Sequence, residues 1–353
     1  MAVCRDNHYV PQFYLRNWGT DNKVFVHRLL VPHEKYPEWE HCAIKNTAYI
    51  DNLYVRIEDG AEYDDFEIDF NKQVETPAKP VLDKICAEQK LTPADWRILC
   101  DYITAQYVRT PSFYHFVAEW GKKEVPKTVD SVLAGVAEKV EWSPTVQAGP
   151  DRTRLLPLEL SVSKSPDDQS NTYLKVTTVI GKNLWLYTIN HTLSTDSPVR
   201  QAFRKMKWSV VTAPTGIVWP TCDAPVIIAE TDQHGNLHVT NGYGIADRAI
   251  VFPISPHKVL LATHKRIFDW RFEADIFLAR QIKNAIVNNA LMYVYSSIKD
   301  SEVMTIRNRF VDETEFRRQQ EQYAEWYNKY KTDEAPLLTT KQNIIQQTQE
   351  EIP

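Results

Sequence analysis

Residues 92–111 read TPADWRILCDYITAQYVRTP, and this stretch sets the centre of the helical part of the chain. Thr92 is a suitable N-cap, Pro93 suits the first helical position and Asp95 places an acid in the first turn. Apolar side chains then recur at helical spacing: Trp96, Leu99, Cys100, Ile103 and Tyr107. This pattern predicts a buried helix that ends near Pro111, where the next helix begins.

Working outward from this helix, the pattern changes along the chain. Further helices are expected in the N-terminal half, at 80–90, from 111 through Trp120, and at 127–140. A short helical turn at 14–19 and a strand at 23–29 precede them. In the C-terminal half, short runs of apolar and β-branched residues are separated by turn residues, a pattern typical of strands. The strand predictions are 173–180, 184–189, 208–212, 216–219, 226–229, 249–253 and 259–262, with turns at 213–216 and 234–236.

Two further helices, at 273–295 and 313–331, are expected to close the C-terminal half. The fold class predicted is therefore α+β: a largely helical N-terminal half packed against an antiparallel β-sheet. We expect one globular domain over residues 1–332, with a subdomain boundary or mobile loop at the proline-rich 143–170. Residues 333–353, rich in Thr, Gln and Glu, are expected to form a disordered tail.

Composition excludes several classes of protein. The chain has 353 residues and a net charge of -5, which argues against a surface that grips nucleic acid throughout. Only 10 residues are Gly and no glycine-rich phosphate loop occurs. The five Cys are scattered, which favours free thiols, although a zinc site from Cys4, His8, His41 and Cys42 is an alternative. Neither a signal peptide nor a membrane span is recognisable, so a cytoplasmic location is expected by default.

Four motifs resemble those of one known family. They are HYVPQFYLRNW at 8–18, QYVRTP at 106–111, TCDAPV at 221–226 and FPISP at 252–256. In this order they resemble elements of a bacterial family known as domain of unknown function 4238, and the resemblance extends from residue 8 to about 295. Trp18 stands where Phe is commoner, and Thr221-Cys222 stands where Ser often precedes the Asp. The family label names no activity, so the resemblance sharpens the choice of site residues and leaves the reaction open.

Three residues are candidates for acid–base catalysis. His8 precedes a Val-Pro bend, where it is suited to be a general base or a metal ligand, or simply to bridge a turn. Glu75 lies at a predicted helix entry, where acids are also common as helix stabilisers. Asp223 follows an apolar segment and precedes Ala-Pro, which suits a catalytic carboxylate at a sheet end or a turn-former.

Three residues are candidates for substrate binding. Gln106 and Arg109 are three apart and share a helix face, and an arginine there can fork onto a phosphate or form a structural ion pair. Asn289 lies on the apolar face of a predicted helix, where it would fix a loop or touch a ligand. Aromatic base-stacking platforms need interleaved cations, and the nearest case, residues 200–208, is short.

Two functions from different classes fit these residues. The first is a hydrolase acting on a nucleotide or nucleic-acid phosphate, with a divalent metal as a candidate cofactor, in which an imidazole, a guanidinium and a carboxyl converge. A toxin or phage-defence effector is suggested for it by the kind of family, with no supporting residue. The second is a non-catalytic binding or regulatory protein whose polar motif residues form a structural network, with the aromatic helix 313–331 as a partner surface. An open cleft within hydrogen-bond reach favours the enzyme, and full burial with every polar atom paired favours the network.

Overall fold

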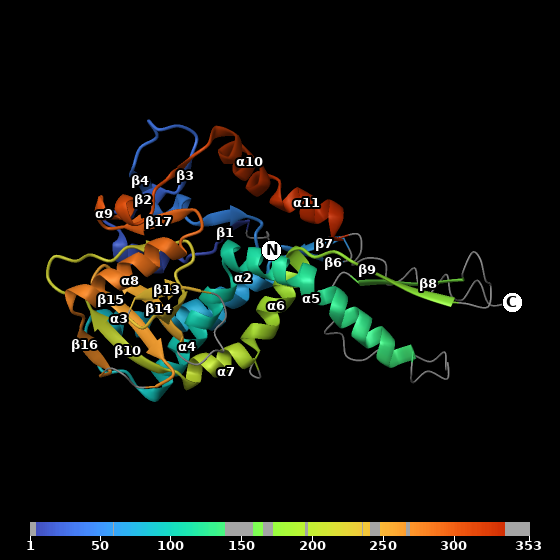
Figure 1. Ribbon diagram of the computed structural model, residues 1–353, viewed down its shortest axis with the longest axis horizontal. Helices are drawn as coiled ribbons and strands as arrows, with labels where there is room; N and C mark the ends of the chain where they lie inside the picture. The colour runs from blue at the N-terminus through green and yellow to red at the C-terminus, as the bar shows by residue number, and fades with distance from the viewer. Residues whose placement is uncertain are drawn as a thin grey trace.

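The computed structural model describes residues 5–58, 60–137, 158–164, 172–194, 197–234, 236–240, 248–265 and 269–335. The fold is α+β: helices from the middle of the chain are combined with two larger sheets, one of six strands and one of four (Figure 1). Most of the predicted boundary at 143–170 lies outside the described residues, as does the predicted tail from residue 336 onward.

The N-terminal half contains short strands followed by long helices. The strands are β1 (Asp6–His8), β2 (Lys23–Arg28), β3 (Leu30–Val31), β4 (Glu40–Ala43), β5 (Tyr49–Asp51), β6 (Arg56–Glu58) and β7 (Ala61–Tyr63). The helices are α1 (Gln12–Leu15), α2 (Asp65–Asp69), α3 (Thr76–Cys86), α4 (Pro93–Val108) and α5 (Pro111–Ala137). A π-helical segment, η3 (Phe70–Glu75), joins α2 to α3.

The rest of the chain begins with the hairpin β8 (Leu158–Lys164) and β9 (Thr172–Thr178) and the helices α6 (Lys182–Leu193) and α7 (Pro198–Lys205). The later strands are β10 (Lys207–Thr212), β11 (Thr221–Cys222), β12 (Ile227–Thr231), β13 (Leu237–Val239), β14 (Arg248–Ser255), β15 (Lys258–Thr263), β16 (Arg271–Glu273), β17 (Tyr293–Ser296) and β18 (Phe310–Val311). The last helices are α8 (Ile276–Asn289), α9 (Glu302–Ile306), α10 (Glu313–Ala324) and α11 (Trp326–Asp333).

The larger sheet has the strand order β13-β12-β14-β15-β10-β16 and is antiparallel except at the β10–β16 edge. Successive side chains of β14 point to opposite faces, as the pleat requires. Val251 packs with Ile282 of α8, while Ile250 and Phe252 join the core that contains α3 and α4. The sheet is therefore covered by helices on both faces.

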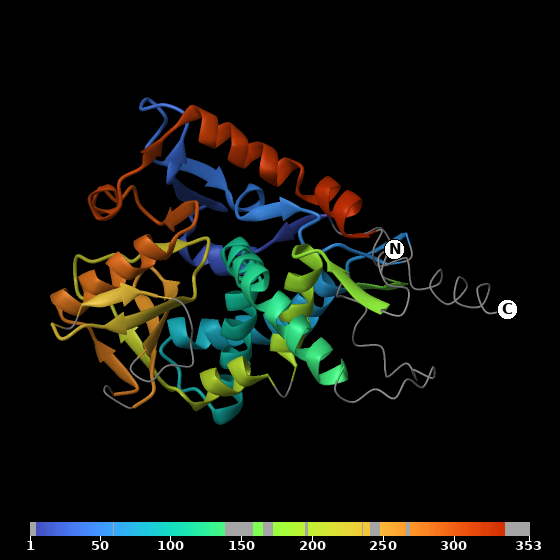
Figure 2. The same ribbon diagram turned by 45° about the vertical axis from the view of Figure 1, so that its right-hand side comes forward.

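The second sheet combines two strands from near the start of the chain with two strands from its later part. Its order is β11-β17-β2-β4, and each pairing is antiparallel. The pairing of β17 with β2 brings Tyr295 opposite Val26, so the strand that follows the opening motif lies beside the segment that follows α8. In Figure 2, α10 and α11 run along the blue strands of this part of the molecule.

The helix expected from residue 92 is confirmed together with its cap. Thr92 Oγ1 accepts the Asp95 N–H at 3.2 Å, and Asp95 Oδ2 accepts the Thr92 N–H at 2.8 Å. This reciprocal arrangement satisfies two backbone donors that the helix itself leaves without partners. Leu99 and Ile103 are fully buried, so the predicted apolar stripe faces the core.

Two strand predictions are wrong. Residues 184–189 belong to α6, because a short apolar run does not distinguish a buried strand from a buried helix. Trp185, on this helix, is fully buried and its Nε1 donates to Val108 O at 2.8 Å. Residues 216–219 follow a tight turn, in which Gly216 has a φ of +88°, but form no strand. Trp219 instead donates its indole N–H to Ala279 O at 2.9 Å.

Several helix boundaries also differ from the prediction, and the helix expected at 80–90 is α3, which spans Thr76–Cys86. The helix expected at 127–140 is part of α5, which runs unbroken from Pro111 to Ala137. The helix expected at 273–295 ends at Asn289, and the chain then enters β17. Tertiary contacts cause this last difference, because Asp223 and strand β2 hold the residues after the helix in extended form.

The single helix expected at 313–331 is divided into α10 and α11, and the aromatic side of α11 faces the rest of the chain. Trp326 and Tyr330 are 7% and 2% exposed, so these two rings offer little surface to a partner. Just after the helix, Glu334 is buried, and its carboxylate accepts the N–H groups of Lys182 and Asn183 at 2.8 and 2.7 Å. The end of the described chain therefore caps the start of α6.

Lys182 is buried beside this contact. Its ammonium donates to Asn52 O at 2.9 Å and to Val55 O, and burial lowers the pKa of Lys182 to about 7. None of the helices in the described ranges combines the length and apolar composition needed to cross a membrane.

Candidate functional site

Arg109 is the centre of the first polar cluster. It follows the last residue of α4 and is 1% exposed. All three guanidinium nitrogens donate: Nη1 to Glu75 Oε1 at 2.5 Å, Nη2 to His8 O at 2.6 Å and Nε to the Tyr54 hydroxyl at 3.3 Å. The guanidinium also lies over the Phe70 ring, 4.5 Å from its centroid. Arg109 thus ties the opening motif, β5–β6 and the η3 segment to α4.

Glu75 is positioned by the π-helical segment. This segment widens the helix between α2 and α3 and ends at Glu75, whose side chain is 16% exposed. Phe70, at the other end of the same segment, is buried against Arg109. The nearby Glu75 carboxylate helps to hold the pKa of Arg109 above its usual value despite the burial. Glu75 and Arg109 therefore form a largely buried ion pair, which is the structural alternative expected for Arg109, with Glu75 as the partner that the sequence did not identify.

The imidazole of His8 points elsewhere. Only the backbone carbonyl of His8 contacts Arg109, whereas the ring nitrogen Nε2 lies 3.2 Å from Lys45 O. The ring packs against Tyr49, with 5.6 Å between centroids. Burial lowers the pKa of His8, which favours the neutral ring. His8 and Glu75 were both expected as candidate acid–base groups, but no hydrogen bond joins their side chains in the described part of the chain.

Glu67 was not predicted and lies in the same electrostatic environment. It is on α2, partly buried, and its Oε2 has no hydrogen-bond partner among the described residues. Burial raises the pKa of Glu67 to about 7, although the positive charge of Arg109 opposes the shift. In the sequence, Glu67 lies in an acidic stretch with Asp64, Asp65 and Asp69, and nothing in the pattern distinguishes it from these neighbours.

Asp223 is the centre of a second cluster. It follows β11 and is 2% exposed. Its Oδ1 accepts the Leu291 N–H at 2.8 Å, and its Oδ2 accepts those of Met292 and Tyr293 at 2.6 and 3.2 Å. Burial raises the pKa of Asp223 to about 6, while these backbone donors oppose the rise. Asp223 therefore holds the chain between α8 and β17, and no hydrogen bond links it to Arg109 or His8 in the described part of the chain.

Gln106 and Asn289 tie the two clusters to their surroundings. Gln106, 1% exposed, donates through Nε2 to Tyr9 O at 2.7 Å, while its Oε1 has no partner among the described residues. Asn289 donates through Nδ2 to Ala224 O at 2.5 Å. Both residues were predicted to bind substrate, and both line the same cleft.

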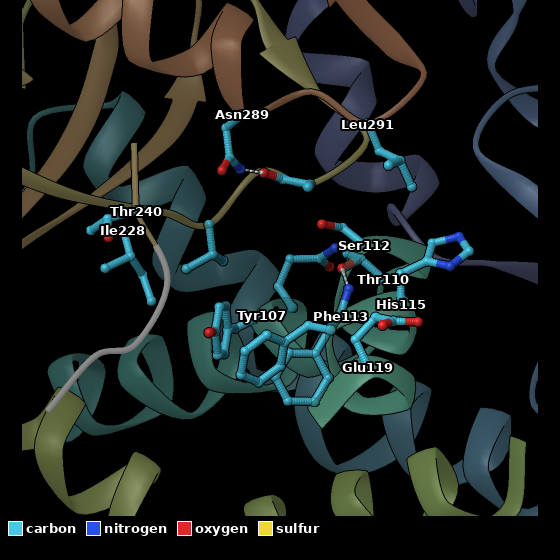
Figure 3. Close-up of a pocket in the computed structure, with 14 residues that line it drawn as sticks. Tyr107, Thr110, Ser112, Phe113, His115, Glu119, Ile228, Thr240, Asn289 and Leu291 are labelled. Atoms are coloured by element: carbon cyan, nitrogen blue, oxygen red, sulfur yellow. Dashed lines mark hydrogen bonds between the residues drawn. The ribbon is translucent and has the colours of Figure 1, made fainter. Parts of the chain in front are cut away.

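This first cleft has a volume of about 380 Å³ and lies between the α4–α5 junction and the chain around residues 224–228 and 289–291. In Figure 3, Asn289 and Leu291 approach from the upper side, and Tyr107 and Phe113 from the helices below. Its remaining polar groups include Ser112, His115 and Glu119. Neither Lys nor Arg is among the described residues that line it.

A second cleft, of about 490 Å³, lies on the other side of the same wall. Leu291 lines the first cleft, whereas Met292 and Tyr293 line the second. The Gln106–Tyr9 hydrogen bond spans the wall in the same way, because Gln106 faces the first cleft and Tyr9 the second. The Gln106–Tyr9 contact and the segment 291–293, which Asp223 holds, therefore lie between two open cavities.

The described residues do not form the zinc site considered as an alternative from the sequence. Among the described residues, no group of three His, Cys, Asp or Glu side chains is arranged to hold a metal ion. Cys42 and His41 lie on β4, where His41 stacks on Phe25, and Cys42 is a free thiol. Cys4, the remaining cysteine of the zinc alternative, lies outside the described residues.

Comparison with known proteins supports the family resemblance that the four motifs suggest. No curated protein and no solved structure shows significant similarity to the chain. One family model, described as "Protein of unknown function (DUF4238)", matches residues 6–300 and so includes the four motifs, both polar clusters and every residue that lines the first cleft. The chain belongs to the DUF4238 family.

Proposed function

We propose that this chain is a non-catalytic binding protein whose polar motif residues form a structural network. The observation that carries the proposal is that the charged groups of Arg109 and Asp223 are buried and hydrogen-bonded to other parts of the protein. Arg109 and Asp223 are 1% and 2% exposed, and their nitrogen and oxygen atoms are occupied by protein partners. A substrate would have to displace buried hydrogen bonds to reach either group, at a cost of about 1–3 kcal/mol for each polar atom left unpaired.

The ligand site that this network supports is the first cleft. Its buried acceptor, Gln106 Oε1, lacks a donor among the described residues, and buried polar groups rarely remain so. Glu119 contributes a carboxylate, whereas Phe113 and Phe116 contribute apolar surface. A neutral or cationic small molecule with an N–H donor and an apolar portion matches these groups, and a phosphate does not.

A fragment screen by thermal shift and ligand-observed NMR tests this proposal. Aromatic amides and amines are the probes, and the diagnostic variant is Phe116→Ala, which removes a ring that lines the cleft and is 41% exposed. Trp120→Ala is the matched control, because Trp120 is 48% exposed on the same helix and does not line the cleft. We expect fragments to bind the wild type and the control, and to bind Phe116→Ala weakly. Equal binding to all three proteins overturns the assignment.

A hydrolase acting on a nucleotide or nucleic-acid phosphate is our second proposal, and Glu67 favours it. Its Oε2 is buried without a hydrogen-bond partner among the described residues, and burial raises the pKa of Glu67 to about 7, the range that suits a general acid or base. The test compares wild type and Glu67→Gln for hydrolysis of nucleoside triphosphates and single-stranded RNA, with and without Mg²⁺, and for toxicity on expression. Activity that Glu67→Gln abolishes at unchanged melting temperature supports catalysis and the effector role. Absence of turnover in the wild type supports the binding protein.

A further inference from the structure

A third cavity lies away from both clefts, where three distant segments meet. Its volume is about 590 Å³. Lys90 to Cys100 at the start of α4 form one side, Arg204 to Trp208 at the α7–β10 junction form another, and Trp270 before β16 completes it. The backbone fixes this last contact, because the Val210 N–H donates to Trp270 O at 2.8 Å.

The charge of this cavity is opposite to that of the chain. Its lining contains Lys90, Arg97, Arg204 and Lys207 and no acidic residue among those described, whereas the whole chain carries -5. Arg204 is paired with Asp101 at 2.8 Å. Lys90, Arg97 and Lys207 are exposed and have no ion-pair partner in the described part of the chain. Three cations are thus concentrated on one concave surface, where like charges repel unless an anion is bound.

The same surface carries three indole rings. They belong to Trp96, Trp208 and Trp270. Trp208 is 6% exposed and anchored by its Nε1, which donates to Phe203 O at 2.9 Å. Trp270 is 43% exposed, and its ring is backed by the guanidinium of Arg271 at 4.4 Å from the centroid. An exposed, braced indole beside unpaired cations is the combination that binds an aromatic base together with its phosphates.

We propose that this cavity binds a nucleoside diphosphate or triphosphate, with the base on Trp270 and the phosphates on Lys90, Arg97 and Lys207. The residues 200–208 alone are a short basic stretch, and the fold adds the cations and indoles of two other segments to it. The cavity is small and bounded, and the chain as a whole is acidic, so the charge suits a few phosphates better than a long polyanion. The proposal is independent of the first cleft, because the two cavities share no lining residue.

Titrations of the full chain with adenosine triphosphate, inorganic triphosphate and adenosine, followed by calorimetry and tryptophan fluorescence at low salt, test the proposal. We expect the Lys90→Ala/Lys207→Ala variant to bind adenosine triphosphate about 5- to 20-fold more weakly, from two lost ion pairs at a partly exposed site. Trp270→Ala should weaken adenosine triphosphate and leave inorganic triphosphate unchanged, since the latter has no base to stack.

Matched controls separate this site from general charge effects. Lys79→Ala/Lys122→Ala removes two exposed lysines that do not line the cavity, and Trp120→Ala removes an exposed indole elsewhere. Melting curves for each variant confirm folding. Absence of binding at millimolar adenosine triphosphate, or equal weakening in the control variants, overturns the site. Binding of a 12-nucleotide single strand more than about 10-fold tighter than adenosine triphosphate overturns the ligand class in favour of nucleic acid.

Discussion

Replacing Arg109 with methionine is the sharpest test of the structural network. The substitution keeps a long apolar stem and removes the guanidinium. It leaves three groups without their donor: the Glu75 carboxylate, the His8 carbonyl and the Tyr54 hydroxyl. If these contacts hold the opening motif on α4, their loss must lower the free energy of unfolding.

The magnitude follows from burial. Removing one member of a buried ion pair costs about 3–5 kcal/mol. The Glu75 side chain is 16% exposed, so water can reach part of the orphaned carboxylate, and we expect the lower end, about 3 kcal/mol. This is a large share of the roughly 5–15 kcal/mol that stabilises a typical fold. Arg109→Met/Glu75→Leu should recover part of the loss, because it leaves no unpaired buried charge.

Urea unfolding followed by tryptophan fluorescence measures these differences, and the buried Trp185 lies near Tyr54, 5.7 Å between ring centroids. Arg317→Met is the control, since Arg317 forms an ion pair with Glu313 in which both side chains are largely exposed. We expect its midpoint to stay close to that of the wild type. A loss below about 1 kcal/mol for Arg109→Met would refute a structural role for this network.

Three other predictions concern buried groups. Asp223→Asn should lower the free energy of unfolding by about 1–3 kcal/mol, measured in urea, because an amide N–H would face one of the three backbone donors. For Lys182, the pKa of about 7 in the fold lies below 10.5, so the unfolded chain binds more protons between these values and the wild type gains stability as pH rises from 7 to 9. Lys182→Met should gain less over that interval, and equal gains in urea melts at both pH values would disprove this. When the native protein is labelled with a thiol reagent at pH 8, the exposed Cys86 should react before Cys100 and Cys222. The reason is that burial raises the pKa of Cys100 to about 12 and that of Cys222 further. Mass spectrometry maps the labelled sites, and simultaneous labelling of all three contradicts the described burial.

The fold was predictable where local chemistry and tertiary packing agree. The capped start of α4 is confirmed because its cap involves Thr92 and Asp95, which are three residues apart. The strand predicted at 184–189 was wrong because most of its apolar residues are buried in the core. A segment buried in this way lacks the alternation of apolar and polar residues that distinguishes a strand from a helix. The end of α8 was wrong because Asp223, far away in sequence, supplies the acceptors that extend residues 291–293.

The same distinction applies to the candidate site. The motif residues identified Arg109 and Asp223 as special, and both are among the most buried charged groups of the described chain. Whether their side chains contact a ligand or other protein groups depends on the direction in which each side chain points. Local sequence does not determine that direction. His8 shows this most clearly, because its carbonyl contacts Arg109 while its imidazole packs on Tyr49.

By itself, the sequence determined the α+β class, the capped central helix and the family, because each depends on residue types at short spacings. Only the tertiary structure decided that the Gln106–Tyr9 contact and the segment 291–293 lie between two clefts, and that Lys90, Lys207 and Trp270 share a third cavity. The physical reason is that these groups are separated by up to about 180 residues, and chain folding alone sets which of their atoms lie within hydrogen-bonding or stacking distance.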